Sequence, residues 1–149
     1  DGSGFQKGVG AAAVLYRDGE EQRVLRYRLG HEDDHEVYEA KCVGMVMGLH
    51  MATQEDDITE LSIWADNTAA ITATDTPKTG SAHYILDMFH ELLNNLRQMH
   101  PAIPVTISWV PGHKGVEGNE RADQEAKRAA TTRSSTKRTL PAQLRAALP

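Results

Sequence analysis

The chain has 149 residues, a formal net charge of −5 and an ordinary globular composition, with 40% hydrophobic and 25% charged residues. That length suits one domain, and no apolar run approaches the roughly 20 residues that cross a membrane, so a membrane-spanning protein is excluded. Cys42 is the single cysteine, which excludes an internal disulfide and favours a reducing intracellular compartment, the nucleus or the cytoplasm.

The first thirty residues predict an antiparallel meander of three strands. Asp1 lies on the first strand, and a strand of small apolar residues is expected at 9–16. The dipeptide Asp18-Gly19 is typical of a hairpin turn, and partial alternation of apolar residues with arginines predicts a third strand at 22–29.

The middle of the chain alternates between helical and extended patterns. Glu39 begins a buried stripe on the first helix, and Asp66 follows a short apolar strand directly. We expect a helix at 37–53, a strand at 61–65, a helix from 67 to before 77, a helix at 82–99 and a strand at 105–110. This order favours an α/β fold, a mixed sheet with helices on its faces.

The stretch "VTISWVPGHKGVEGNERADQEA" predicts a strand, a polar loop and a helix. Asn119 is a suitable cap for that helix, which places Asp123 at the start of its second turn. His113 lies between glycines on a loop that can move, and a neutral imidazole can exchange a proton near pH 7.

The charges are distributed unevenly along the chain. All 21 acidic residues lie at or before Glu125, and the later charges are positive only. Such a tail indicates a polyanion or an acidic protein surface as partner, and a solvated helix end without a partner is the alternative. Its Thr, Ser, Arg and Lys content predicts a basic, loosely ordered tail at 131–149, with a short helix at 142–148.

Four carboxylates occupy strand ends or helix starts, which share one edge of such a sheet: Asp1, Glu39, Asp66 and Asp123. Taken singly, each is better explained as a solvated side chain or a helix-end charge than as a ligand. Brought together they repel one another unless a divalent cation neutralises them. All-oxygen ligands favour Mg²⁺ or Mn²⁺, and two ions about 3.5–4 Å apart suit a phosphodiester displacement.

Four segments, in this order, resemble the type 1 ribonuclease H domain, most closely the version found in retrotransposon and retroviral polyproteins: "DGSG", "YEAK", "WADNTAAI" and "WVPGHKGVEGNERADQEAK". The resemblance covers residues 1–130. It implies a ribonuclease-H-like fold with a five-stranded mixed sheet, an antiparallel three-strand meander followed by parallel strands, flanked by helices. It also implies endonucleolytic hydrolysis of the RNA strand of RNA–DNA hybrids by two-metal-ion catalysis, with a reverse transcriptase domain expected in the same polyprotein.

The resemblance also assigns roles to particular residues. Its motifs match a metal-binding and catalytic tetrad of carboxylates with a mobile histidine that assists proton transfer or product release: Asp1, Glu39, Asp66, Asp123 and His113. Ser3 and Asn67 are expected to contact substrate, although Asn67 can instead cap the following helix. The family places the first aspartate in mid-strand, so we expect the natural sequence to continue upstream of Asp1.

Other readings of the chain remain open. A catalytically silent ribonuclease-H-like scaffold that binds nucleic acid or protein is the main alternative, and a related DNA-cutting nuclease or integrase is a third; the presence of all four acids favours the enzyme. Trp64 and Trp109, on predicted strands, are expected in the core rather than as base-stacking platforms. Cys42 is expected to be a small buried residue rather than a nucleophile.

Overall fold

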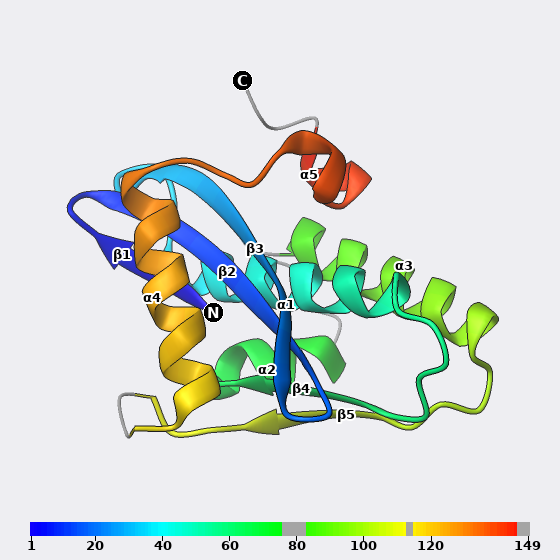
Figure 1. Ribbon diagram of the computed structural model, residues 1–149. Coiled ribbons are helices and arrows are strands. Elements are labelled where there is room, and N and C mark those ends of the chain that lie inside the picture. The colour runs from blue at the N-terminus through cyan, green and yellow to red at the C-terminus, as the bar shows by residue number, and fades with distance from the viewer. Residues whose placement is uncertain (76–82, 113–114, 146–149) are drawn as a thin grey trace.

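Three antiparallel strands begin the fold in the computed structural model, which describes residues 1–75, 83–112 and 115–145 (Figure 1). They are β1 (Gly2–Phe5), β2 (Gly8–Arg17) and β3 (Glu20–His31), with β2 in the centre. The predicted turn at Asp18-Gly19 is confirmed, because both residues have positive φ, 54° and 82°, as a twisted two-residue hairpin requires. The meander predicted from the first thirty residues is therefore present.

Two further strands, β4 (Leu61–Ala65) and β5 (Val105–Trp109), pair in parallel. Between them in the sequence lie α2 (Thr68–Asp75) and α3 (His83–Met99). The α/β class and the order of antiparallel then parallel strands are confirmed. Within the described residues the five strands form two hydrogen-bonded sheets, one of three strands and one of two, rather than one continuous ladder.

Two helices lie against the first sheet at very short range. α1 (Val37–Thr53) contacts β1 and β2, and α4 (Glu117–Thr131) contacts all three strands of that sheet. A Cβ atom on Gly2 would lie 2.3 Å from the backbone nitrogen of Lys41, and one on Gly10 would lie 2.3 Å from that of Ala130. Glycine at these positions therefore lets both helix backbones approach the strands, which brings the start of α1 next to Asp1.

The core gathers around α1, whose side chains are buried on almost every side. α3 packs against α1, and its Ile85, Phe89 and Leu96 are fully or almost fully buried. Cys42 is buried as predicted. No helix in the described parts of the chain is long and apolar enough to cross a membrane.

The expectation that the two tryptophans belong to the core is wrong, since Trp64 is 64% exposed and Trp109 is 54% exposed. Successive side chains of a strand point to opposite faces. In β4 the half-buried residues are Leu61, Ile63 and Ala65, so Trp64 lies on the other face. The composition of a short apolar strand did not reveal which face was buried.

The expectation of a loosely ordered tail is wrong for residues 132–145. After α4 the chain runs back along β3, where the Ser134 and Ser135 hydroxyls accept hydrogen bonds from the backbone nitrogens of Arg28 and Arg26 at 2.8 and 2.9 Å. A short helical turn η1 (Lys137–Thr139) and α5 (Ala142–Arg145) follow. Leu140 and Leu144 are buried. The largely polar composition of this segment did not indicate that these two leucines pack into the core.

Candidate functional site

Asp1 and Asp66 meet at the ammonium group of Lys41. The Lys41 Nζ atom donates to Asp1 Oδ1 at 2.9 Å and to Asp66 Oδ1 at 2.8 Å. Asp1 directly precedes β1, Asp66 directly follows β4, and Lys41 belongs to the first turns of α1. The side chains of Asp1, Asp66 and Lys41 are only 3%, 10% and 18% exposed, so this is a largely desolvated ion triplet.

Electrostatic effects on the pKa of Asp66 show how this triplet is stabilised. Burial acts to raise that pKa, but the hydrogen bond and charge of Lys41, together with a hydrogen bond from the Asn119 side chain, hold it below its usual value. The Asp66 carboxylate is therefore ionised at neutral pH.

Asp123 lies within electrostatic range of the same place. Burial and then Lys41 lower the pKa of the Asp1 amino group to about 5, whereas Asp66 and Asp123 act in the opposite direction. The Asp123 carboxylate also pairs with Lys127 on the next turn of α4, at 3.0 Å. The charge of Asp123 therefore acts at the start of β1, where Asp1 and Asp66 meet.

Glu39, the fourth predicted acid, has its carboxylate engaged elsewhere. Its Oε1 accepts a hydrogen bond from the Glu36 backbone nitrogen at 3.1 Å, which forms a capping box at the start of α1. Its Oε2 accepts the Tyr84 hydroxyl at 3.2 Å. These contacts assign Glu39 a role in beginning the helix and joining it to α3, and its role as a metal ligand stays a prediction.

The other predicted site residues fall in different places. Asn67 caps α2, because its Oδ1 accepts a hydrogen bond from the Ala70 backbone nitrogen at 2.8 Å, so the capping role considered for it is confirmed. Ser3 is buried in β1, and its contact with substrate stays a prediction. His113 lies outside the described residues.

The expected cap of α4 needs correction. The helix begins at Glu117 with Val116 at the cap position, so Asn119 lies within its first turn. There its side chain hydrogen-bonds to Asp66 instead of the helix end. The sequence analysis assigned neither Asn119 nor Lys41 a role at the acids. The one signal that could have indicated Lys41 is its position two residues after Glu39.

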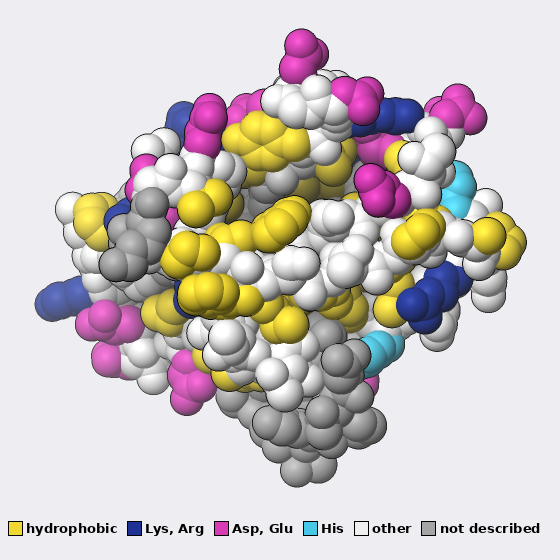
Figure 2. Space-filling model, turned by 90° about the horizontal axis from the view of Figure 1, so that it is seen from below, with side chains coloured by type: hydrophobic (Ala, Val, Ile, Leu, Met, Phe, Trp, Pro, Cys, Tyr) yellow, Lys and Arg dark blue, Asp and Glu magenta, His cyan; other side chains and the backbone are white. Residues whose placement is uncertain are grey.

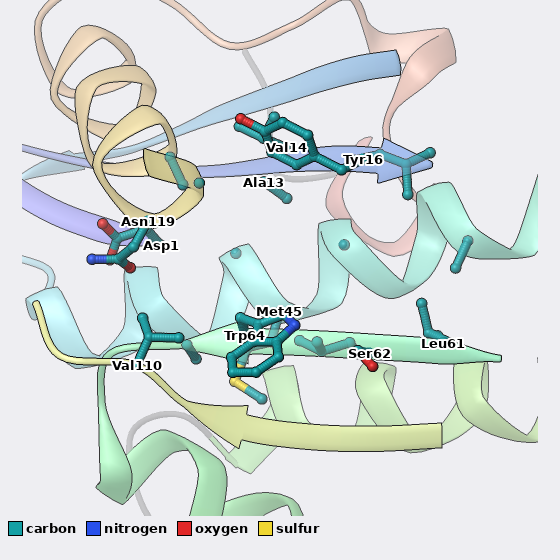
Figure 3. Close-up of a pocket in the computed structure, with 18 of the residues that line it drawn as sticks. Asp1, Ala13, Val14, Tyr16, Met45, Leu61, Ser62, Trp64, Val110 and Asn119 are labelled. Atoms are coloured by element: carbon teal, nitrogen blue, oxygen red, sulfur yellow. The ribbon is translucent and has the colours of Figure 1, made fainter. Parts of the chain in front are cut away.

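A cleft of about 940 Å³ extends from the acids between β2 and β4. Asp1 and Asn119 line one end of it, while Val14, Tyr16 and Trp64 line its length (Figure 3). Hydrophobic side chains gather on the hollowed face seen from below (Figure 2). The charged end of the cleft is therefore continuous with an apolar trough.

The donor chemistry of this end suits a hard divalent cation. All the donors are carboxylate oxygens, and Asp1 Oδ2 is buried without a hydrogen-bond partner. However, the ammonium of Lys41 holds the position shared by Asp1 and Asp66. In the described part of the chain no three His, Cys, Asp or Glu side chains lie close enough together to hold a metal ion.

Comparison with solved structures defines the class of fold. The chain is similar to the crystal structure of RNase H1 from the halophilic archaeon Halobacterium salinarum NRC-1, with a TM-score of 0.64 and 17% sequence identity. The similarity covers 87% of this chain and 92% of that one. The α/β architecture is accordingly the ribonuclease-H-like fold that the motifs predicted.

The family assignment comes from the sequence itself. The RNase H family model matches residues 1–131, and the chain belongs to the RNase H family. A search of curated proteins found no match. Membership implies a ribonuclease, a hydrolase that cuts the RNA strand of RNA–DNA hybrids and generally uses divalent metal ions.

Proposed function

We propose that this chain is a ribonuclease H domain that acts endonucleolytically on the RNA strand of RNA–DNA hybrids. The observation that carries the proposal is the meeting of Asp1 and Asp66 at one end of a cleft, in a chain whose residues 1–131 match the family. A carboxylate from a strand start and one from a strand end meet there, and the charge of Asp123, on a helix, acts at the same place. Strand ends of this kind are where an α/β fold binds its ligands.

Asp1, Asp66 and Asp123 are the acids proposed to hold Mg²⁺, or Mn²⁺ in its place, and two ions are expected with substrate. To do so they would have to come closer together than they lie in the described residues, where no three such side chains are near enough to hold a metal ion. A divalent cation bound there supplies Lewis-acid chemistry for phosphodiester hydrolysis. The chain's own contribution is to orient the acids: Asn119 and Lys41 fix the Asp66 carboxylate, and Gly112 lies so close that an added Cβ would be 2.9 Å from Asp66 Oδ2.

Substrate discrimination would rest on the two strands of the hybrid. Contacts to 2′-hydroxyl groups distinguish RNA from DNA, and phosphate contacts set the register. Ser3 is the proposed substrate contact in β1, and His113 the proposed group for proton transfer or product release. We further propose a retroelement polyprotein with a reverse transcriptase domain as the natural context.

A second candidate function is favoured by one observation. Lys41 already neutralises part of the charge of Asp1 and Asp66, as a divalent cation would. A domain of this kind could bind hybrids without cutting them, which is the silent scaffold considered from the sequence.

A substrate panel tests the proposal. Labelled RNA–DNA hybrid, duplex DNA and duplex RNA are incubated with the chain, with Mg²⁺, Mn²⁺ or chelator. Metal-dependent loss of the hybrid's RNA strand alone supports the ribonuclease, whereas binding of hybrid without cleavage supports the scaffold. Neither binding nor cleavage of hybrid contradicts both.

Asp66→Asn is the variant that assigns cleavage to this site. It removes a carboxylate charge at nearly constant volume, so hybrid cleavage should fall at least a hundredfold while circular dichroism stays the same. The matched control is Asp33→Asn, which makes the same change at a side chain that is 82% exposed and should keep full activity. Retained cleavage by Asp66→Asn would contradict the assignment of cleavage to this site.

A further inference from the structure

Lys41 is a cation within the group of acids rather than at its edge. Its Nζ bonds one oxygen of each of two carboxylates, both of which are at least nine-tenths buried. The second oxygen of Asp1, Oδ2, is buried and has no partner. Two negative charges therefore share one positive charge, with a lone carboxylate oxygen beside them.

We propose that Lys41 is a built-in counter-ion that competes with divalent cations for the place between Asp1 and Asp66. The inference rests on the proposed function only in treating these acids as a cation site. It goes beyond that function because it makes metal affinity a property set by one lysine. It applies equally to a hydrolase with a high metal requirement and to a scaffold that does not cut.

A metal ion that enters this place must displace Lys41 from both carboxylates. A divalent cation that takes Asp1 Oδ1 and Asp66 Oδ1 breaks two charge-assisted hydrogen bonds, which are the strong kind. It must then coexist with a nearby ammonium, and like charges repel strongly at a site shielded from water.

The backbone of Lys41 is held close against β1, so the ammonium can move only as far as its side chain reaches. Its nitrogen faces Gly2 so closely that a Cβ atom on that glycine would lie 2.3 Å away. The side chain is 18% exposed and therefore enclosed along most of its length. The ammonium can leave the carboxylates by rotating its own side chain, but α1 holds its starting point beside β1.

Glu39 does not offset this charge. Its two oxygens accept hydrogen bonds from the Glu36 backbone nitrogen and the Tyr84 hydroxyl, and its Oε2 also lies 3.6 Å from His35 Nδ1. Asp123 is paired with Lys127. Each acid near the site thus has its own partner, and Lys41 is the one cation shared between two of them in the described residues.

Metal binding is measured directly, without reference to cleavage. Free Mn²⁺ is followed by electron paramagnetic resonance while the full chain is titrated, for the parent, Lys41→Met and Lys41→Arg. Lys41→Met should bind Mn²⁺ at least tenfold more tightly than the parent, and Lys41→Arg, which keeps the charge, should remain weak. Lys7→Met makes the same charge change at the exposed β1–β2 turn and should leave the affinity unchanged.

A second measurement uses the parent chain and needs no variant. Acetylation of lysines by a small anhydride is quantified by mass spectrometry, with and without saturating Mn²⁺. Displacement of the ammonium by metal should increase the modification of Lys41 several-fold while Lys7 stays constant. Equal Mn²⁺ affinity of parent and Lys41→Met, or no change in Lys41 acetylation at saturating Mn²⁺, would overturn the proposal.

Hybrid binding separates this proposal from the proposed function. Fluorescence anisotropy with labelled RNA–DNA hybrid is recorded in chelator for the parent and Lys41→Met. Absence of hybrid binding would count against the ribonuclease H function and leave the Mn²⁺ result standing. Hybrid binding with unchanged Mn²⁺ affinity in Lys41→Met would refute the counter-ion alone.

Discussion

Glu39 and Lys41 lie two positions apart in the same turn of α1 and face different surroundings. Residue type alone assigns the carboxylate to the acid site and the lysine to solvent. In the fold, Glu39 closes the capping box and meets Tyr84, whereas Lys41 reaches the two aspartates. A helix turns about 100° per residue, so two positions are enough to separate the directions of two side chains.

A substitution at Glu39 tests this division of roles. Glu39→Gln keeps an oxygen that can accept from the Glu36 nitrogen, so the free energy of unfolding should change by less than about 0.5 kcal/mol, while Glu39→Ala should lose about 1–2 kcal/mol. Urea unfolding measures the stability, and Mn²⁺ titration of Glu39→Gln against the parent tests separately whether Glu39 is also a metal ligand. A tenfold loss of Mn²⁺ affinity in Glu39→Gln would identify Glu39 as a metal ligand, and an unchanged affinity would leave it with the structural role alone.

At the scale of elements, α4 is joined to β3 by a buried carboxylate. Glu125 Oε2 accepts from Arg26 Nη1 at 2.6 Å, and Oε1 pairs with Arg121, which also reaches Glu21. Burial acts to raise the pKa of Glu125, but Arg121 and Arg26 together hold it below its usual value of 4.5. The ion pairs therefore outweigh desolvation and fix the helix against the sheet.

This pKa shift predicts how stability depends on pH. A carboxyl group whose pKa is lowered by folding stabilises the protein above its unfolded value, and that contribution is lost as the pH falls through the folded value. Glu125→Gln should thus cost about 1–3 kcal/mol at pH 7, because Arg26 and Arg121 lose the carboxylate that they share, although Arg121 keeps Glu21. The difference from the parent should shrink steadily below pH 4.

Urea unfolding at pH 7 and pH 3 measures the effect of Glu125→Gln. Glu117→Gln, at an exposed position of the same helix, controls for the change in charge and should be nearly neutral at both pH values. A constant difference between Glu125→Gln and the parent over this pH range would mean that packing, not charge, is responsible.

At the scale of the whole molecule, the segment after α4 is an integral part of the folded structure. Residues 132–145 pair with β3 and then bury Leu140 and Leu144 in the main core, beyond the segment that matches the family. Figure 1 shows the segment crossing from the end of α4 to α5, near α3. It connects the far end of the sheet to the helical layer.

Leu140→Ala tests whether this connection is energetically important. Removing a fully buried leucine side chain should lower the free energy of unfolding by about 2–4 kcal/mol, through lost transfer energy and the cavity that remains. Urea denaturation gives the value, and exposed Arg133→Ala should change it by less than about 0.5 kcal/mol. If Leu140→Ala lowers the free energy of unfolding by less than 1 kcal/mol, the segment contributes little to stability and is better described as a loose tail.

The sequence by itself determined the elements that depend on neighbours in the chain. The bounds 37–53 and 61–65 match α1 and β4, and the Asp18-Gly19 turn is present, because periodicity and turn chemistry act within a few residues. Only the tertiary structure decided that Lys41 lies between Asp1 and Asp66, that Trp64 faces outward and that Leu140 is buried. These three placements depend either on contacts between segments 25 or more residues apart or on which face of an element is covered. Neither long-range contacts nor the choice of face produces a periodic pattern in the local sequence.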